Sequence, residues 1–390
     1  MPTWTPTQLT NGTAAGRCHS HSYYDIPVID EEATNVLVHE IAFAERHPTA
    51  SDVVEVGTVA LDRPGEVVPI GESRAWSWQQ GPMAQWVGGG GLAAYNDREG
   101  DGFVARLVDT RTGDRRALPR PLYAVAPDGR FGLCLNMARL DHLRPGYGYT
   151  EGEGALMEER APHGDGVWRM DMGTGEARMI LSLAEAREFL MTRLALPRRA
   201  LQALRPPHFW FNHVKLSPNA ERYTVKLRWR LPNKGWSDKQ GVSLTGSVAG
   251  GGLRLLADAT SHVVWLNDEQ LYLWRAPEVA LYEDAGGKDN RLRQVAPDLL
   301  DHNVHMRHLP PGPTGTLGEA VYDTPYREEI DLYCYDDRTG ARELMASFTG
   351  HRPARGPFRC DLHPVPSADG RTVIVTSMRD GGRQVYALRR

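Results

Sequence analysis

The chain has 390 residues, of which 41% are apolar and 24% charged, and its formal net charge at pH 7 is −4. This composition is typical of a soluble globular protein with a substantial core. The slightly acidic balance argues against a general nucleic-acid binder, because no large positive field would attract phosphates.

The N-terminal stretch MPTWTPTQLTNG has neither the basic nor the apolar segment of a signal peptide. No later apolar run is long enough to cross a bilayer. The four cysteines are scattered, which favours a reducing compartment with free or metal-bound thiols: Cys18, Cys134, Cys334 and Cys360. We therefore expect a cytoplasmic protein that does not bind a membrane.

A phrase of turns and strands recurs along the chain. Its first half is a turn of the SPDG type followed by an apolar strand, at 126–138, 217–229 and 367–377. Its second half ends in D-x-x-T-G or a close variant, at 104–118, 167–180 and 332–345. Asp-Gly and Thr-Gly corners between alternating strands are hairpin signals, and a unit of four such strands approaches the roughly 40–50-residue period of propeller blades.

The repeats predict an all-β fold, a seven-bladed β-propeller that takes up the whole chain, 1–390, as one domain. The predicted blades are 20–75, 76–120, 121–188, 205–256, 258–298, 300–350 and 355–390. The last unit lacks a strand, and the N-terminal TWTPTQLT can supply it and close the ring, which removes an exposed edge. One helical insertion, 181–205, interrupts the pattern, either as a surface element that packs locally or as a lid over the ring.

Histidines recur just before the innermost strand of five of the seven predicted blades. Because these positions converge near the axis of a propeller, we expect their side chains to lie on one face: His19, His21, Tyr23, Tyr24, Gln79, Gln80, Asn212, His213, His262, His302, His305, His308, Cys360, Asp361 and His363. Three imidazoles and a thiolate from adjacent blades would suit tetrahedral Zn²⁺: His262, His305, Cys360 and His363. The alternative is that these are unrelated polar residues of the core.

Several short motifs resemble a group of seven-bladed propellers related to the oligogalacturonate lyases and, more distantly, to ulvan lyases. They are GRCHSHSYYDIP, RAWSWQQGPMAQW, YNDREGDGF, LPRPLYAVAPDGR, RPGYGY, HFWFNHVKLSPN, SHVVW and RCDLHP. The resemblance implies a divalent metal held by the His of SHxxW and by a later Gln-x-x-His-Pro-His segment. The matching positions here are His262 and then Cys360 and His363, with Val365 in place of the second His of that segment. This departure favours zinc over manganese, and a structural over a catalytic metal.

The chemistry that the resemblance implies is β-elimination on a uronate of an acidic oligosaccharide. Arg228 would neutralise the sugar carboxylate, although Arg230 lies on the same face of its strand. His213 and His21 would serve as base or acid, in competition with Tyr24 or Tyr147, which would need a neighbouring cation to ionise. Further candidates for substrate binding are Arg74, Gln80, Asn96 and Tyr147.

Two other functions stay open at this point. A propeller can be a non-catalytic scaffold that binds a glycan or a protein, with its histidines holding a structural zinc. A glycoside hydrolase would instead use paired carboxylates such as Asp97, Asp141 or Asp361, whose separation the sequence does not define.

Overall fold

The recurring D-x-x-T-G phrase forms the same tight turn wherever it occurs. In the first copy, Asp109 Oδ1 accepts hydrogen bonds from the backbone N–H groups of Arg111 and Thr112, at 2.8 and 3.1 Å. Gly113 then adopts a φ of 81°, a left-handed conformation that costs glycine little. The second copy repeats both features at Asp171 and Gly175. The phrase is therefore a strand-reversal signal, which explains its period.

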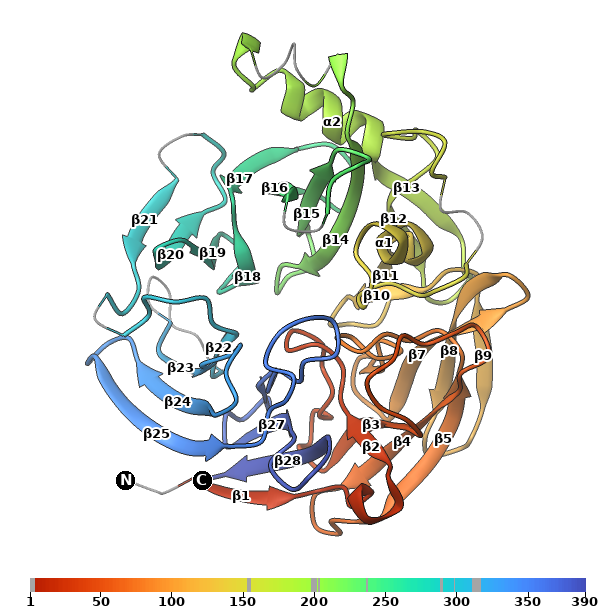
Figure 1. Ribbon diagram of the computed structural model, residues 1–390, viewed down its shortest axis with the longest axis vertical. Coiled ribbons are helices and arrows are strands. Elements are labelled where there is room, and N and C mark those ends of the chain that lie inside the picture. Colours follow the sequence, from red (N-terminus) through yellow and green to blue (C-terminus); the bar gives the residue numbers. More distant parts are fainter. Residues whose placement is uncertain are drawn as a thin grey trace.

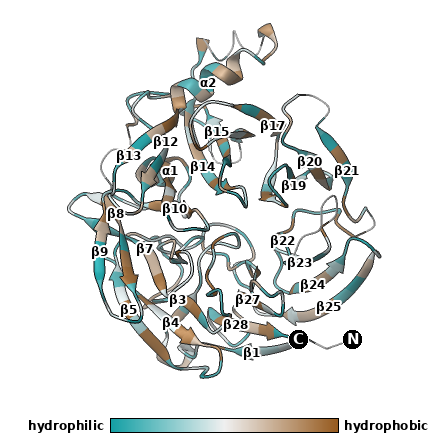
Figure 2. Ribbon diagram, turned by 180° about the vertical axis from the view of Figure 1, so that it is seen from behind, coloured by the Kyte–Doolittle hydropathy of each residue, from teal (hydrophilic) through white to brown (hydrophobic). Residues whose placement is uncertain are grey.

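The computed structural model describes residues 4–152, 156–197, 202, 204–235, 238–287, 290–297, 299–310 and 317–390. Seven four-stranded antiparallel sheets surround a central axis (Figure 1). The seven-bladed β-propeller predicted from the repeats is confirmed. Apolar residues concentrate on strands such as β4, β5 and β7, where neighbouring blades pack (Figure 2).

The first four blades run from the inner to the outer strand in chain order. Blade 1 contains β2 (Cys18–Ser20), β3 (Asn35–Ile41), β4 (Val54–Ala60) and β5 (Val67–Ser73). Blade 2 contains β6 (Gln85–Trp86), β7 (Leu92–Glu99), β8 (Gly102–Asp109) and β9 (Arg115–Leu118). Blade 3 contains β10 (Leu122–Val125), β11 (Phe131–Cys134), β12 (Gly166–Asp171) and β13 (Ala177–Ser182). Blade 4 contains β14 (His208–Leu216), β15 (Arg222–Arg230), β16 (Gln240–Ser247) and β17 (Arg254–Asp258).

The ring closes where the two ends of the chain meet in blade 7. Blade 5 contains β18 (Ser261–Trp265), β19 (Gln270–Arg275), β20 (Glu278–Glu283) and β21 (Arg291–Gln294). Blade 6 contains β22 (Met306–His308), β23 (Glu319–Asp323), β24 (Ile330–Asp336) and β25 (Ala341–Phe348). Blade 7 contains β26 (Val365–Pro366), β27 (Thr372–Ser377), β28 (Gln384–Arg389) and the N-terminal β1 (Thr5–Gln8), which pairs with β28 as the outermost strand. This pairing gives β28 a partner on both sides.

Two α-helices whose bounds lie within the described residues interrupt the sheets, in addition to a 3₁₀ turn, Thr13–Ala15. Helix α2 (Leu183–Met191) begins at Ser182, whose side chain forms a capping box with Glu185, and lies at the outer rim of the ring (Figure 1). The described part of the 181–205 insertion is thus a peripheral element; residues 198–201 and 203 lie outside the described residues. Helix α1 (Met137–Leu143), between β11 and β12, was not predicted. None of the described helices combines the length and the apolar run needed to cross a bilayer.

Buried Arg139 holds the α1 insertion against blade 4. Its guanidinium donates to the carbonyl of Phe209 at 2.8 Å and to the carbonyls of Leu156, Glu159 and Arg160. It is 1% exposed. The loop that follows α1 is therefore attached to β14, and this loop carries two residues of the site.

Candidate functional site

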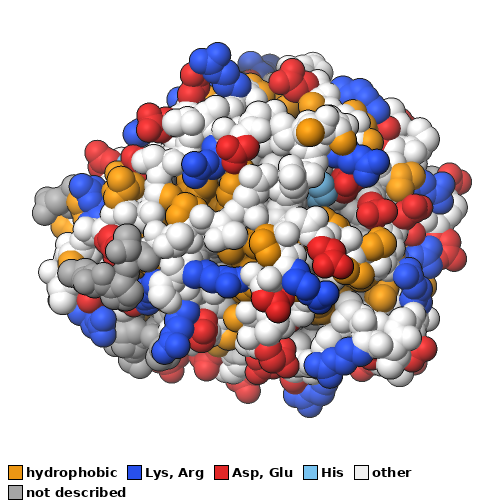
Figure 3. Space-filling view, turned by 90° about the horizontal axis from the view of Figure 1, so that it is seen from below, with side chains coloured by type: hydrophobic (Ala, Val, Ile, Leu, Met, Phe, Trp, Pro, Cys, Tyr) orange, Lys and Arg blue, Asp and Glu red, His pale blue; other side chains and the backbone are white. Residues whose placement is uncertain are grey.

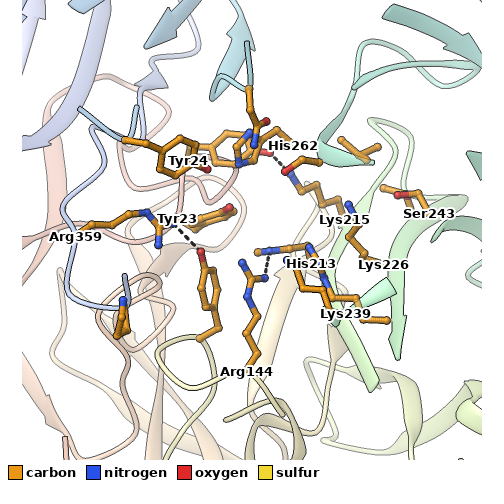
Figure 4. A pocket seen from close by; sticks show the side chains of 18 of the residues that line it. Tyr23, Tyr24, Arg144, His213, Lys215, Lys226, Lys239, Ser243, His262 and Arg359 are labelled. Atoms are coloured by element: carbon orange, nitrogen blue, oxygen red, sulfur yellow. Dashed lines mark hydrogen bonds between the residues drawn. The ribbon is translucent and has the colours of Figure 1, made fainter. Parts of the chain in front are cut away.

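A cavity of about 490 Å³ opens in the middle of the ring. Its lining comes from blades 1, 3, 4, 5, 6 and 7, mostly from inner strands and from the loops beside them. This arrangement follows from propeller geometry, because the inner strands converge on the axis. It brings together residues that are far apart in the sequence (Figure 4).

The lining of the cavity is strongly cationic. It contains Arg144, Lys215, Lys226, Arg228, Lys239 and Arg359, and no Asp or Glu occurs among the described lining residues. The outer surface differs, because acidic and basic side chains are interspersed over the face shown in Figure 3. Although the chain has a net charge of −4, its cavity is lined by cations. Such a lining suits an anionic ligand.

Tyr147 lies between two guanidinium groups. Arg359 Nη2 donates to the Tyr147 hydroxyl at 2.9 Å, and the Arg144 Cζ lies 3.3 Å from the centre of the Tyr147 ring. Burial alone would raise the pKa of this phenol, but the charges of Arg144 and Arg359 outweigh it, so the pKa lies below its ordinary value. The neighbouring cation that a catalytic tyrosine needs is therefore present twice.

His213 has a partner on both ring nitrogens. Arg144 Nη1 lies 3.0 Å from Nε2, and the Tyr123 hydroxyl lies 2.9 Å from Nδ1. Since a guanidinium can only donate, Nε2 must accept, and the proton resides on Nδ1. Burial, followed by the charges of Arg144 and Lys215, holds the pKa of His213 well below its ordinary value. His213 lines the cavity as a neutral ring stacked on Tyr23, with ring centres 5.0 Å apart.

Strand β15 points Lys226 and Arg228 into the cavity because alternate residues of a strand share one face. Arg228 is 8% exposed, and its Nε donates to Asn212 Oδ1 at 3.1 Å. Burial and the charge of Arg144 lower the pKa of Arg228 to about 9, so it remains charged at neutral pH. Arg230 is not among the lining residues and donates to the carbonyl of Lys234 instead.

A second group of side chains, His305, Asp361 and His363, could hold a metal ion. One ligand atom from each lies within 4.8 Å of the others, and all three side chains are buried. Asp323 binds His305 through Nδ1 at 3.0 Å, which leaves His305 Nε2 for the group. The Nε2 atoms of His305 and His363 have no hydrogen-bond partner among the described residues. Buried nitrogens without partners, next to a carboxylate, fit a divalent cation.

The two other expected ligands lie outside this group. His262 packs on His305, with ring centres 4.1 Å apart. Cys360 is buried with Sγ near the carbonyls of Asp361 and Thr376, at 3.9 and 3.7 Å. Adjacent residues of an extended segment point to opposite sides, so Asp361, and not Cys360, accompanies the histidines.

The remaining proton-transfer candidates differ in position. Tyr24 lines the cavity and accepts a hydrogen bond from Lys215 Nζ at 2.8 Å; burial and the charge of Asp25 raise its pKa well above the ordinary value. His21 does not line the cavity. Its Nδ1 binds the carbonyl of Ser22 at 2.6 Å, and burial lowers its pKa to about 4.

The three remaining candidates for substrate binding also lie outside the cavity lining. Arg74 is exposed. Gln80 is fully buried and donates to the Tyr123 hydroxyl behind His213. Asn96 joins blades 2 and 3, because its side-chain amide bonds the backbone of Leu122 in both directions, at 2.7 and 2.8 Å. Polar residues near inner strands thus also serve to join blades.

Sequence reasoning missed most of the cations of the cavity: Arg144, Lys215, Lys226, Lys239 and Arg359. Arg144 begins the RPGYGY motif, in which only the aromatic residues had been considered. Lys226 shares a strand face with Arg228, and this alternation was the available signal. Lys215 gave no such signal, because the register of β14 shifts between Asn212 and Lys215. Nothing in the local sequence of Arg359 or Lys239 indicates a site.

No protein-family model matches the chain, and no curated protein sequence matches it. Its fold is similar to solved structures of oligogalacturonate lyases. One, in complex with manganese, has a TM-score of 0.61 and 14% identity, over 100% of this chain and 96% of the other. Another, from Vibrio parahaemolyticus, has a TM-score of 0.58 and 12% identity, over 100% and 97%. Tricorn protease matches at 0.50 with 12% identity, over 95% of this chain and 34% of its own. At these identities the likeness shows a common propeller fold.

Proposed function

We propose that the protein cleaves a uronate-containing oligosaccharide by β-elimination and leaves a 4,5-unsaturated uronate at the new non-reducing end. The observation that carries this proposal is the cationic cavity with Tyr147 between two guanidinium groups. The fold-level likeness to oligogalacturonate lyases over nearly their whole length supports it.

The reaction needs three things from the cavity. The sugar carboxylate must be neutralised so that the C5 proton becomes acidic, a base must take that proton, and an acid must protonate the departing oxygen at C4. The C5–H electron pair becomes the C4=C5 double bond as the C4–O bond breaks.

Arg228 neutralises the carboxylate in this proposal, because it is charged, buried and directed into the cavity. Tyr147 gives its proton to the departing oxygen. Arg144 and Arg359 stabilise the phenolate that remains after this transfer, which is the same effect that lowers the pKa of Tyr147. His213 orients Arg144 through Nε2 and does not itself transfer a proton.

The glycoside hydrolase alternative needs two carboxylates at the scissile bond. Asp97 pairs with Arg106 at 3.1 Å and Asp361 with Arg359 at 2.8 Å, and neither lines the cavity, nor does Asp141. The binding-scaffold alternative remains as an outcome of the experiment below.

The test of the proposed function is a panel of galacturonate, glucuronate and rhamnose–glucuronate oligomers. The unsaturated product absorbs at about 235 nm. We expect at least one oligomer to give this absorbance, because proton removal at C5 and protonation of the departing oxygen form the C4=C5 bond. Cleavage without the chromophore would show hydrolysis instead. Binding without any cleavage would show a scaffold.

We also propose one divalent metal ion per chain at His305, Asp361 and His363. Such an ion would supply positive charge and cross-link the inner ends of blades 6 and 7. Without a thiolate in the set, the argument that favoured zinc over manganese no longer applies, because imidazole and carboxylate suit both ions. The rings of Tyr23 and Tyr24 pack against His363 and His305, with centres 4.6 and 5.2 Å apart, and form the adjacent wall of the cavity.

The metal proposal predicts different results for the histidines and for the cysteine. After dialysis against zinc or manganese, elemental analysis should give about one ion per wild-type chain, and His363→Ala should lose it and melt at a lower temperature. Cys360→Ser should retain the metal. A Cys360→Ser protein without metal, or a His363→Ala protein with a full ion, would contradict the assigned ligands.

A further inference from the structure

Lys226 is a buried amine without a partner at the wall of the cavity. It lies in the middle of β15, between Asn212 of β14 and Ser243 of β16. Its side chain lines the cavity and is 5% exposed. Its Nζ has no hydrogen-bond partner among the described residues. A protein does not ordinarily bury an ammonium group in this way, because desolvation of the charge is not compensated.

The charged groups that act most strongly on Lys226 are all cations. Burial, followed by the charges of Arg228, Arg144, Lys215 and Lys239, holds its pKa well below the ordinary value. The neighbouring His262, on β18, also has a pKa well below its ordinary value, because of burial and then His305. The nearby Asp25 carboxylate pairs with Lys215 at 3.2 Å. Lys226 therefore releases its proton more readily than an ordinary lysine does.

Three other groups of the cavity that could take a proton are already engaged, although His262 Nδ1 also has no partner among the described residues. His213 Nε2 accepts from Arg144, the Tyr24 hydroxyl accepts from Lys215, and the Tyr147 hydroxyl accepts from Arg359. Lys226 also lies on the blade 4 side of the cavity, across His213 from Arg359 (Figure 4). A sugar between these two sides would have Lys226 on one side and Arg359, with Tyr147 bound to it, on the other.

We infer that Lys226 is the base that removes the C5 proton of the substrate. This inference rests on the proposed elimination and adds the group that the reaction still lacks. The Nζ lone pair takes the C5 proton, the C5–H pair becomes the C4=C5 bond, the C4–O bond breaks, and the proton of Tyr147 goes to the departing oxygen. Lys226 becomes an ammonium group and later returns its proton to water.

The main test compares Lys226→Arg and Lys226→Met with wild type on the oligomer whose product absorbs at about 235 nm. We expect kcat to fall about 100-fold in both variants, the usual contribution of a general base. Lys226→Arg should keep KM within about threefold, because it preserves a long polar side chain at the wall and adds a charge that suits an anionic ligand, but it cannot accept a proton at neutral pH. Lys234→Met, an exposed lysine of the same blade, is the matched control and should behave as wild type. In Lys226→Ala, small primary amines should restore turnover, more strongly with greater amine basicity.

A second test needs no turnover. The unfolded chain binds a proton on this lysine up to its ordinary pKa of roughly 10.4, whereas the folded chain does not. The free energy of unfolding of wild type should therefore rise with pH up to that value, and Lys226→Met should rise less steeply. If the free energy of unfolding rose equally steeply with pH in wild type and in Lys226→Met, Lys226 would not be a neutral amine in the folded protein.

The outcomes separate this inference from the proposed function. If wild type produces the chromophore and Lys226→Arg retains a kcat within about threefold of it, Lys226 is not the base, and the elimination stands. If wild type produces the chromophore from no oligomer, the proposed function fails and this role fails with it. A normal kcat in Lys226→Arg together with an unchanged pH slope would leave Lys226 as a structural residue.

Discussion

Replacing Tyr147 with phenylalanine should lower kcat about 1000-fold on a natural uronate oligomer, within the range for loss of a general acid. KM should change little, because the ring and both guanidinium groups remain. The alkaline limb of the pH profile of kcat/KM should also lose the contribution of Tyr147, whose pKa Arg144 and Arg359 lower against the effect of burial. Only the deprotonation of Arg228, with a pKa of about 9, should then remain in that limb. Initial rates at 235 nm (approximate) across pH measure both effects.

A change of leaving group can show whether Tyr147 acts as a general acid or as a general base. A uronate with an aryl group at O4 departs with little protonation, so the loss in Tyr147→Phe should shrink to about tenfold on that substrate. Tyr149→Phe is the matched control, because the Tyr149 hydroxyl bonds Asn96 at 2.8 Å and lies outside the cavity lining. That control should keep kcat and lose only about 1 kcal/mol of stability. An equal loss on both substrates would show that Tyr147 does not protonate the departing oxygen.

Replacing Arg228 with methionine should lower kcat/KM about 1000-fold, the scale for loss of a group that stabilises developing negative charge. Arg228→Lys should recover part of the loss, because it restores a charge without the planar pair of donors. Arg230→Met is the matched control on the same strand, since Arg230 points its guanidinium to the carbonyl of Lys234. Michaelis–Menten analysis of the three variants measures these effects.

The stability of the Arg228→Met protein tells a lost function from a lost fold. Arg228 is buried beside Arg144, and the two like charges repel. The variant should therefore melt at the same temperature as wild type or above it. If its kcat/KM stays within about tenfold of wild type, another cation neutralises the carboxylate, and Arg144 is the first candidate. The proposed elimination reaction would still stand in that case. A variant that melts well below wild type would contradict the repulsion argument.

The fold was predictable because its signals are local. Each D-x-x-T-G turn is held by an aspartate that accepts hydrogen bonds from backbone N–H groups close behind it, two and three residues later at Asp109 and Asp171 and two residues later at Asp336. The phrase marks blades 2, 3 and 6, and repeated four-stranded units can bury their apolar faces against one another in a ring, so repetition of a local signal predicted the architecture. Helix α1 was missed because it is a single short element inside blade 3, without a repeat to mark it.

The features of the candidate site also differ in whether they follow from local sequence signals or from tertiary contacts. The sequence by itself determined which residues lie at or just before the inner strands, and hence that His213, His305 and His363 converge, because propeller register follows from the repeats. It could not determine which side chain of a pair points inwards, as Asp361 does in place of Cys360. Nor could it show that cations from five separate loops and strands surround one cavity, and that no carboxylate occurs among the described lining residues. Charge and burial are sums over neighbours distant in the chain, and only the tertiary structure decides which neighbours these are.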